Sequence, residues 1–401
     1  MNTKMSTLLV AMLTTVLASR EASAIQDLAA WNGTVDTLPS GQIDVRNPDS
    51  DAWLLSAQWR MSVDYQIGAL DGAGPDVFGQ IQDFEVDGFG RWWVLDAHSQ
   101  DLRVFDASGE YVRTVGRSGS GPGEFSNAIA LARSAEGNLW VIDPGNGRVS
   151  VFDTTGAFLG SHAMPTAGIM TLPWPGGFDR SGSFYALTYL VDQSEESGLA
   201  KLMVRHTPSF EPIDSVAPPE PATPAESLDL KGDRGHGSTP IPFTPALKWR
   251  LVDGDFWAAE TGEYHLVKTG WHGDTLRTIR REFVPLRVTR ADIDAYEAEL
   301  REFFGQSLKI DRSAIPKRMP AIDDFFVDEA GYVWVLRTAA ATAPPGSTFD
   351  LFDPVGRLLG KVDIPFEVSL YAPPIVRNDY FYAVIEGGLE VQRLVRMRII
   401  R

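Results

Sequence analysis

Two aspartates that could bind a ligand or a metal recur at the same place in a repeated pattern. Asp96 ends the apolar run "RWWVLD", and Asp143 ends "NLWVID" 47 residues later. Carboxylates gathered at one point could hold a hard cation such as calcium through their oxygen atoms. Alternatively, an aspartate at the end of a strand can accept hydrogen bonds from the N–H groups of its own loop. The sequence leaves both interpretations open.

The other candidate ligand-binding residues fall in two groups. In the later units, the residue that ends the corresponding strand is Thr188, then Glu260, then Arg337, and finally Ile385 or Glu386. Of all these strand-end residues, the carboxylates Asp96, Asp143 and Glu260 are the weak candidates for a metal site. Loop positions add His98, Asn146, Arg148, Arg234 and His236. Asn146 and Arg148, in "NGRV", belong to the repeated pattern. We therefore expect their main role to be closing a loop rather than binding a ligand.

The segment "VGRSGSGPGEF" (115–125) has the glycine content of a phosphate-binding loop. Such a loop needs a following helix whose free N–H groups face the anion, usually with a lysine on the phosphate. Here the glycines lead into "SNAIALARS", which is typical of a strand, and no lysine follows. A related segment, "GAGPDVF" (72–78), lies 47 residues before "GSGPGEF" (119–125). We therefore expect a turn between two structural units, where glycine and proline reverse the chain.

The elements that position these residues repeat along the chain. Residues 90–112 align with 137–159, and each copy has a glycine turn, an apolar strand ending in aspartate, a "VFD" strand, a second glycine turn and a last strand. Counted by their second strand, six units lie at 92–95, 139–142, 184–187, 256–259, 333–336 and 381–384. Units of four short strands at such a period are typical of propeller blades. The last unit lacks its outer strand, and 59–68 could complete it and leave no open sheet edge.

The pattern "GSGPGEF … GNLWVID … NGRVSVFD … GAFL" resembles the NHL repeat, and the mature chain resembles exported bacterial six-bladed β-propeller proteins with NHL-like blades. This resemblance implies an all-β fold of six four-stranded antiparallel blades over residues 59–401, with the last blade closed by an N-terminal strand. Residues 25–58 form an N-terminal extension that matches nothing. The resemblance implies no single function, because such propellers serve as binding modules, scaffolds, lyases and hydrolases.

The long connections of such a propeller should all lie on one side. In a four-stranded meander, the connection into strand one and that between strands two and three share one face of the disc, and the other two connections share the opposite face. The first group contains every insertion: 191–198, 217–247, 285–320 and 338–348. Because long loops on a rigid scaffold are where binding sites are usually built, we expect the site on that face, over the central channel.

Two insertions have features of their own. Residues 216–245 are proline-rich and polar, which predicts irregular backbone, and "DRGHGS" (233–238) within them would be a ligand clamp or part of a solvated linker. The insertion 285–320 contains a helix, because Thr289 and Asp292 have capping-box spacing and an apolar stripe follows. The stripe consists of Ile293, Tyr296, Leu300, Phe303 and Phe304. We expect it to pack on the propeller rather than on a partner helix.

Composition indicates an exported protein that avoids polyanions. Lys4, the apolar stretch 6–18 and "ASA" (22–24) predict a signal peptide at residues 1–24, and the absence of cysteine suits a periplasmic or extracellular location. With 53 acidic and 36 basic side chains and a net charge of −17, the chain should be repelled by nucleic acid and anionic lipid. No later segment is apolar enough to insert into a membrane.

The sequence favours binding over catalysis. A propeller lyase resembling the peptide-amidating type would need several histidines aimed into the channel. Only His98 and His236 of the six lie in loops of the elaborated face, and no nucleophile motif is present. The favoured hypothesis is an exported propeller that binds a small molecule, a peptide or a protein partner through its loop-rich face, without a cofactor. The alternatives are a propeller lyase or hydrolase, with calcium as its candidate metal, and an assembly scaffold.

Overall fold

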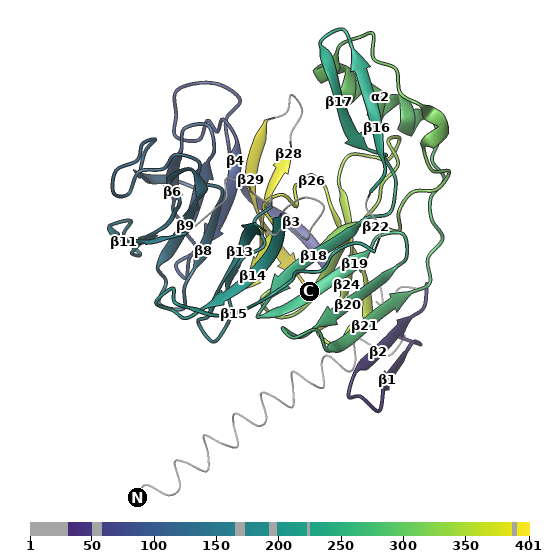
Figure 1. The fold of residues 1–401 in the computed structure, drawn as a ribbon, viewed down its shortest axis with the longest axis horizontal. Coiled ribbons are helices and arrows are strands. Elements are labelled where there is room, and N and C mark those ends of the chain that lie inside the picture. The colour runs from purple at the N-terminus through teal and green to yellow at the C-terminus, as the bar shows by residue number, and fades with distance from the viewer. Residues whose placement is uncertain (1–30, 50–57, 165–172, 192–198, 223–224, 387–390) are drawn as a thin grey trace, which may run out of the picture.

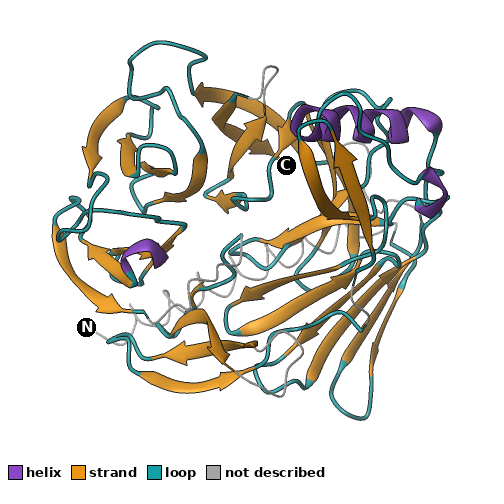
Figure 2. Cartoon of the chain, turned by 45° about the horizontal axis from the view of Figure 1, so that its top comes forward, coloured by secondary structure: helices purple, strands orange, loops and turns teal. Residues whose placement is uncertain are grey.

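The structure, a computed structural model, describes residues 31–49, 58–164, 173–191, 199–222, 225–386 and 391–401. Six β-sheets surround a common centre, which confirms the predicted six-bladed all-β propeller (Figures 1 and 2). The signal peptide expected at residues 1–24 lies outside the described residues. Within them, no helix has the length and apolar character needed to cross a membrane.

Four blades are antiparallel sheets of four consecutive strands. Blade 1 contains β4 (Ile81–Val86), β5 (Trp92–Asp96), β6 (Asp101–Phe105) and β7 (Tyr111–Val115). Blade 2 contains β8 (Ala130–Arg133), β9 (Leu139–Asp143), the short 3-10 helix η1 (Pro144–Asn146), β10 (Arg148–Phe152) and β11 (Phe158–Ala163). Blade 3 contains β12 (Gly177–Phe178), β13 (Phe184–Val191), β14 (Leu199–His206) and β15 (Pro212–Val216). Blade 5 contains β22 (Ile322–Val327), β23 (Val333–Arg337), β24 (Ser347–Phe352) and β25 (Leu358–Ile364).

The other two blades recruit strands from the N-terminal region. Blade 6 contains β26 (Glu367–Val368), β27 (Ile375–Arg377), β28 (Tyr380–Glu386) and β29 (Gln392–Ile400), and its outer strand is β3 (Arg60–Ile67), which confirms the predicted closure. Blade 4 contains β18 (Leu247–Val252), β19 (Asp255–Glu260), β20 (His265–Thr269) and β21 (Thr275–Arg281). A hairpin of β1 (Thr34–Thr37) and β2 (Ile43–Asn47) extends blade 4, with β2 parallel to β21. The N-terminal extension therefore contributes to the ring, which the sequence did not predict.

The core consists of six apolar clusters, and each lies between two neighbouring blades. Strand β9 shows the reason for its unbroken apolar run. Leu139 and Val141 face the blade 1 side, while Trp140 and Ile142 face the blade 3 side. Because a blade is covered on both faces, the side chains that alternate along its inner strands are all buried.

The glycine-rich connection between blades 1 and 2 depends on close backbone approach. Gly116 has a φ of +74°, and a Cβ atom there would lie 2.3 Å from the ring of Phe125, which is itself fully buried in the cluster between the two blades. Only glycine avoids both the strained backbone and the clash. This glycine therefore has the architectural role expected for the loop.

Candidate functional site

The insertions emerge from one face of the propeller, which we call the loop face, while the face with the short turns is the turn face. Strand order places three of them at the same end of the antiparallel strands: the connection from β15 to β18, that from β21 to β22, and that from β23 to β24. The fourth, at 191–198, falls almost wholly outside the described residues. The loop face is thus elaborated as the sequence predicted.

The insertion at 217–247 is not irregular, contrary to our expectation. It forms a hairpin of β16 (Ser227–Gly232) and β17 (Gly235–Pro240), which stands beside α2 (Arg290–Phe304) at one side of the ring (Figure 1). Leu228 and Leu230 are buried against Leu308, with Leu300 and Phe304 of the helix packed on them. Leu228 and Leu230 alternate with polar residues along β16 and give the hairpin one apolar side. The proline-rich flanking sequence made this alternation hard to recognise.

The helix of the second insertion begins as predicted but packs elsewhere. The reciprocal capping box between Thr289 and Asp292 is present, and Asp292 also accepts a hydrogen bond of 2.7 Å from the N–H of Ala341 in the connection between β23 and β24. Leu300 and Phe304 of the apolar stripe pack on the hairpin rather than on the blades, and Phe303 is 71% exposed. The prediction of packing on the propeller was wrong because a second insertion supplies the apolar partner. Beyond α2 the insertion continues through the 3-10 helix η2 (Arg312–Ala314).

The clamp candidates at 233–238 belong to this lobe of hairpin and helix. At the hairpin tip, Arg234 donates to the carbonyl of Glu302 at 2.8 Å, and Asp233 accepts a 3.1 Å bond from the hydroxyl of Ser307. These contacts satisfy groups at the C-terminal end of α2. His236 lies exposed on β17. The hairpin tip is therefore tied to the end of the helix, and the hydrogen-bond partners of Asp233 and Arg234 belong to the lobe itself.

The loop face carries a cleft of about 1240 Å³. Its lining runs from Asp323 on β22, the innermost strand of blade 5, to Lys361 on β25, the outermost strand, so the cleft crosses the whole blade. Lys248 of blade 4 and Glu367 of blade 6 line its sides. Three insertions contribute to it, because Phe243, Leu286 and Ala339 also border the space.

Arg337 is the sequence-predicted candidate that borders this cleft. Its guanidinium pairs with Asp350, which is fully buried and also receives Arg281 and the hydroxyl of Tyr264 at 2.6 Å. Burial, together with the nearby carboxylate, raises the pKa of Tyr264 well above its usual value. Two guanidinium groups thus share one buried carboxylate, and Arg281 also lies 3.7 Å from the carboxylate of Asp49. The buried ion pair holds the Arg337 side chain in place at the edge of the cleft.

Asp96 and Asp143 have the structural role that the sequence left open. Asp96 is fully buried and accepts backbone N–H bonds from Gly79 at 2.9 Å and His98 at 2.8 Å. Asp143 accepts from Asn127 at 2.9 Å and from the Asn146 side chain at 2.7 Å. Each carboxylate therefore joins the connection entering its blade to the loop between strands two and three.

Asn146 and Arg148 close the glycine loop, as expected. The Asn146 amide donates to the carbonyl of Gly119 at 3.0 Å, and the Arg148 guanidinium donates to the carbonyl of Glu124 at 3.0 Å. The loop thus presents carbonyl oxygens to these side chains, whereas an anion site would present N–H groups. The interpretation of residues 115–125 as architecture is confirmed.

The remaining candidates are not brought together. Glu260 is exposed at the end of β19 in blade 4, and His98 is exposed in the loop after β5 in blade 1. Among the residues that the structure describes, no three histidine, aspartate or glutamate side chains form a group that could hold a metal ion. The calcium site stays a hypothesis without a described ligand set.

The sequence missed a charged lining at the turn-face end of the central channel. A space of about 350 Å³ there is bordered by Glu85 of blade 1, Arg133 of blade 2 and Arg377 of blade 6. Arg133 lies 3.7 Å from Glu85, and Arg377 pairs with Glu329. Burial raises the pKa of Glu85 above its usual value. These residues come from different blades, so no sequence spacing relates them.

Comparisons with known proteins agree with this class of fold, a six-bladed β-propeller. A family model described as a 6-bladed beta-propeller matches residues 77–173, which contain blades 1 and 2. A "Putative exported protein" from Bacteroides fragilis has a solved structure with a TM-score of 0.51 and 13% identity, covering 89% of this chain and 100% of that chain. No curated protein matches this sequence.

Two enzymes of known structure are also similar in outline. Virginiamycin B lyase from Staphylococcus aureus has a TM-score of 0.42 and 8% identity, covering 86% of this chain and 100% of that chain. The aldose sugar dehydrogenase from Streptomyces coelicolor has a TM-score of 0.42 and 13% identity, covering 86% and 99%. Likenesses at this identity extend to the fold and to nothing beyond it.

Proposed function

We propose that the mature chain is an exported binding protein with NHL-like blades, and that its ligand is an extended peptide segment held in the loop-face cleft. The supporting observation is that a cleft of about 1240 Å³ lies where three insertions converge on the ring of blades. Export rests on the signal-peptide pattern of residues 1–24 and accords with the exported character ascribed to the Bacteroides fragilis protein.

The composition of the cleft favours a peptide over other ligands. Apolar walls, including Leu286 and Val368, alternate with charges of both signs, among them Lys248 and Glu367. A nucleotide or polyanion would match only the basic side chains of this mixed lining, whereas a peptide carries apolar and charged groups of both signs along one chain. The described residues that line the cleft include no histidine, the residue type that a propeller lyase of the peptide-amidating type would need.

Thermal unfolding in the presence of synthetic octapeptide pools tests this proposal, because a ligand that binds the folded state raises the melting temperature. We expect at least one pool to stabilise the mature chain. Ala339→Trp and Ala343→Trp, at exposed positions in the cleft, should abolish the shift. Ala330→Trp, on an exposed turn of the same blade at the turn face, is the matched control and should retain it. Equal shifts in the cleft variants and the control would refute the proposal.

A further inference from the structure

The turn face carries a hydrogen-bonded pair that recurs in three blades. In each, an aspartate in the turn between strands one and two accepts two N–H bonds from its own turn and a third bond from the ring of the aromatic residue six positions later. The ring bonds are Trp93 to Asp87 at 3.1 Å, Tyr185 to Asp179 at 3.0 Å and Trp334 to Asp328 at 3.0 Å. The carboxylate thereby satisfies a buried aromatic donor.

Blade 2 keeps the aromatic residue but lacks the carboxylate. Trp140 occupies the ring position, and Ser134 stands six residues earlier where the other blades have aspartate. No described residue accepts a hydrogen bond from the Trp140 indole nitrogen, in contrast to Trp93 and Trp334. The Ser134 hydroxyl is buried and has no partner within the described residues. A serine side chain is too short to span the distance that an aspartate spans.

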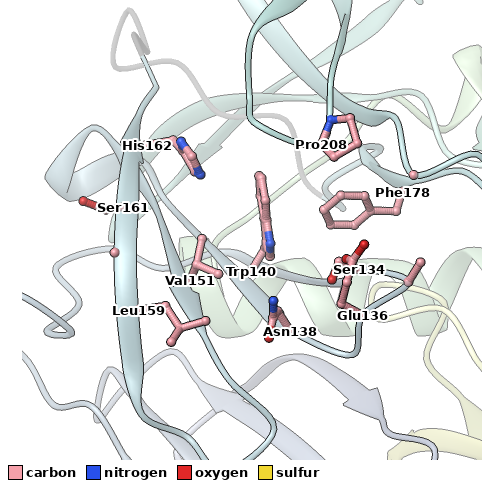
Figure 3. Close-up of a pocket in the computed structure, with 13 residues that line it drawn as sticks. Ser134, Glu136, Asn138, Trp140, Val151, Leu159, Ser161, His162, Phe178 and Pro208 are labelled. Carbon is pink, nitrogen blue, oxygen red and sulfur yellow. The ribbon is translucent and has the colours of Figure 1, made fainter.

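Ser134 lines a pocket of about 310 Å³ between blades 2 and 3. One end is polar: Figure 3 shows the indole nitrogen of Trp140 directed toward the end where Ser134, Glu136 and Asn138 gather. Proximity to Ser134 lowers the pKa of Glu136, so its carboxylate is charged at neutral pH, although the hydroxyl does not meet it in hydrogen-bonding geometry. A ligand group here meets a donor from the indole and an acceptor from the carboxylate.

The other walls of the pocket are apolar and rigid. Val151 and Leu159 of blade 2 face Phe178 and Pro208 of blade 3 (Figure 3). His162 stacks on the Trp140 ring with centroids 5.1 Å apart, so a ligand can reach the edge of the indole while its face stays covered. The pocket is therefore preformed, with an apolar body and one polar end.

We propose that this pocket binds one neutral, hydroxylated ring, a single hexopyranose unit. A sugar hydroxyl can accept from the Trp140 indole and donate to Glu136 at the same time, and the C–H faces of the ring suit the apolar walls. An apolar ligand would leave the indole N–H and the Ser134 hydroxyl unsatisfied. An anion would meet the Glu136 carboxylate and a chain of net charge −17. The volume accommodates one ring rather than an extended chain.

NMR of the mature chain with 15N-labelled tryptophan tests this site directly. The Trp140 indole signal is assigned by its loss in Trp140→Phe, and the probes are methyl α-glucopyranoside, methyl β-galactopyranoside and N-acetylglucosamine. We expect at least one sugar to shift the Trp140 signal while those of Trp93 and Trp334, whose indoles are bonded to aspartates, stay unchanged. Absence of any sugar-dependent shift at Trp140 overturns the proposal.

Substitution of Ser134 separates site filling from unfolding. Ser134→Asp restores the arrangement of blades 1 and 5, so we expect an unchanged or higher melting temperature and binding weakened by at least about tenfold. Ser134→Ala keeps both the space and the free indole N–H and should retain binding. Equal binding by wild type and Ser134→Asp, or equal loss in both variants, would count against the proposal. This pocket lies on the turn face, so a negative result here would not bear on the proposal that the loop-face cleft binds a peptide.

Discussion

Asp143 and Glu260 occupy corresponding positions in two blades, yet the structure predicts opposite effects of removing them. Asp143 is fully buried and accepts four hydrogen bonds, the two shortest being 2.7 Å from the Asn146 side chain and 2.9 Å from the N–H of Asn127. A hydrogen bond to a charged group contributes roughly 1.5–3 kcal/mol. Counting only the two shortest, Asp143→Ala should lower the free energy of unfolding by roughly 3–6 kcal/mol. Glu260 is exposed, so Glu260→Ala should change it by about 0.5 kcal/mol or less.

Equilibrium unfolding in urea, followed by tryptophan fluorescence, measures both variants. Each titration is run with EDTA and again with added calcium. If Asp143 acts through its loop hydrogen bonds, the loss in Asp143→Ala is the same in the two conditions. Calcium-dependent stabilisation of the wild type that disappears in both variants would refute this reasoning and establish a metal site. A loss below about 1 kcal/mol would show that the loop does not depend on the carboxylate.

Three further changes probe the ring. Asp350→Asn leaves Arg281 and Arg337 beside a neutral group, and urea unfolding should show a loss of roughly 3–5 kcal/mol; a loss below about 1 kcal/mol would contradict the buried cluster. Burial raises the pKa of Asp83 from 3.8 to about 7, so the folded protein binds this proton more tightly than the unfolded chain does. The free energy of unfolding should therefore fall as pH rises from about 4 to 7, by at most about 4 kcal/mol. Asp83→Asn should flatten that decline in thermal scans, and an unchanged pH profile would refute the assignment. Deletion of residues up to and including β3 (60–67) uncovers the edge of blade 6, and circular dichroism should show loss of the cooperative transition, whereas an unchanged melting temperature would contradict closure by this strand.

Local patterns predicted those parts of the candidate site that depend on neighbours in sequence. The capping box of Thr289 and Asp292 was readable because its two partners are three residues apart. The loop-closing roles of Asn146 and Arg148 followed from their place in the repeat. The hairpin at 227–240 was missed although Leu228 and Leu230 alternate with polar residues, because the proline-rich flanks dominated the pattern.

The sequence by itself determined the number of blades, the strand that closes them and the face that bears the insertions. These follow from periodicity, because a strand covered on both sides must repeat its apolar residues in every unit. Only the tertiary structure decided where the cleft lies and which aromatic side chain lacks a hydrogen-bond acceptor. Lys248, Arg337 and Glu367, which line the cleft, belong to three different blades. Among the described residues, the Trp140 indole lacks an acceptor because Ser134, unlike the aspartates of the other blades, makes no hydrogen bond to it. Such sites arise from the packing of segments whose distance along the chain carries no information about their distance in space.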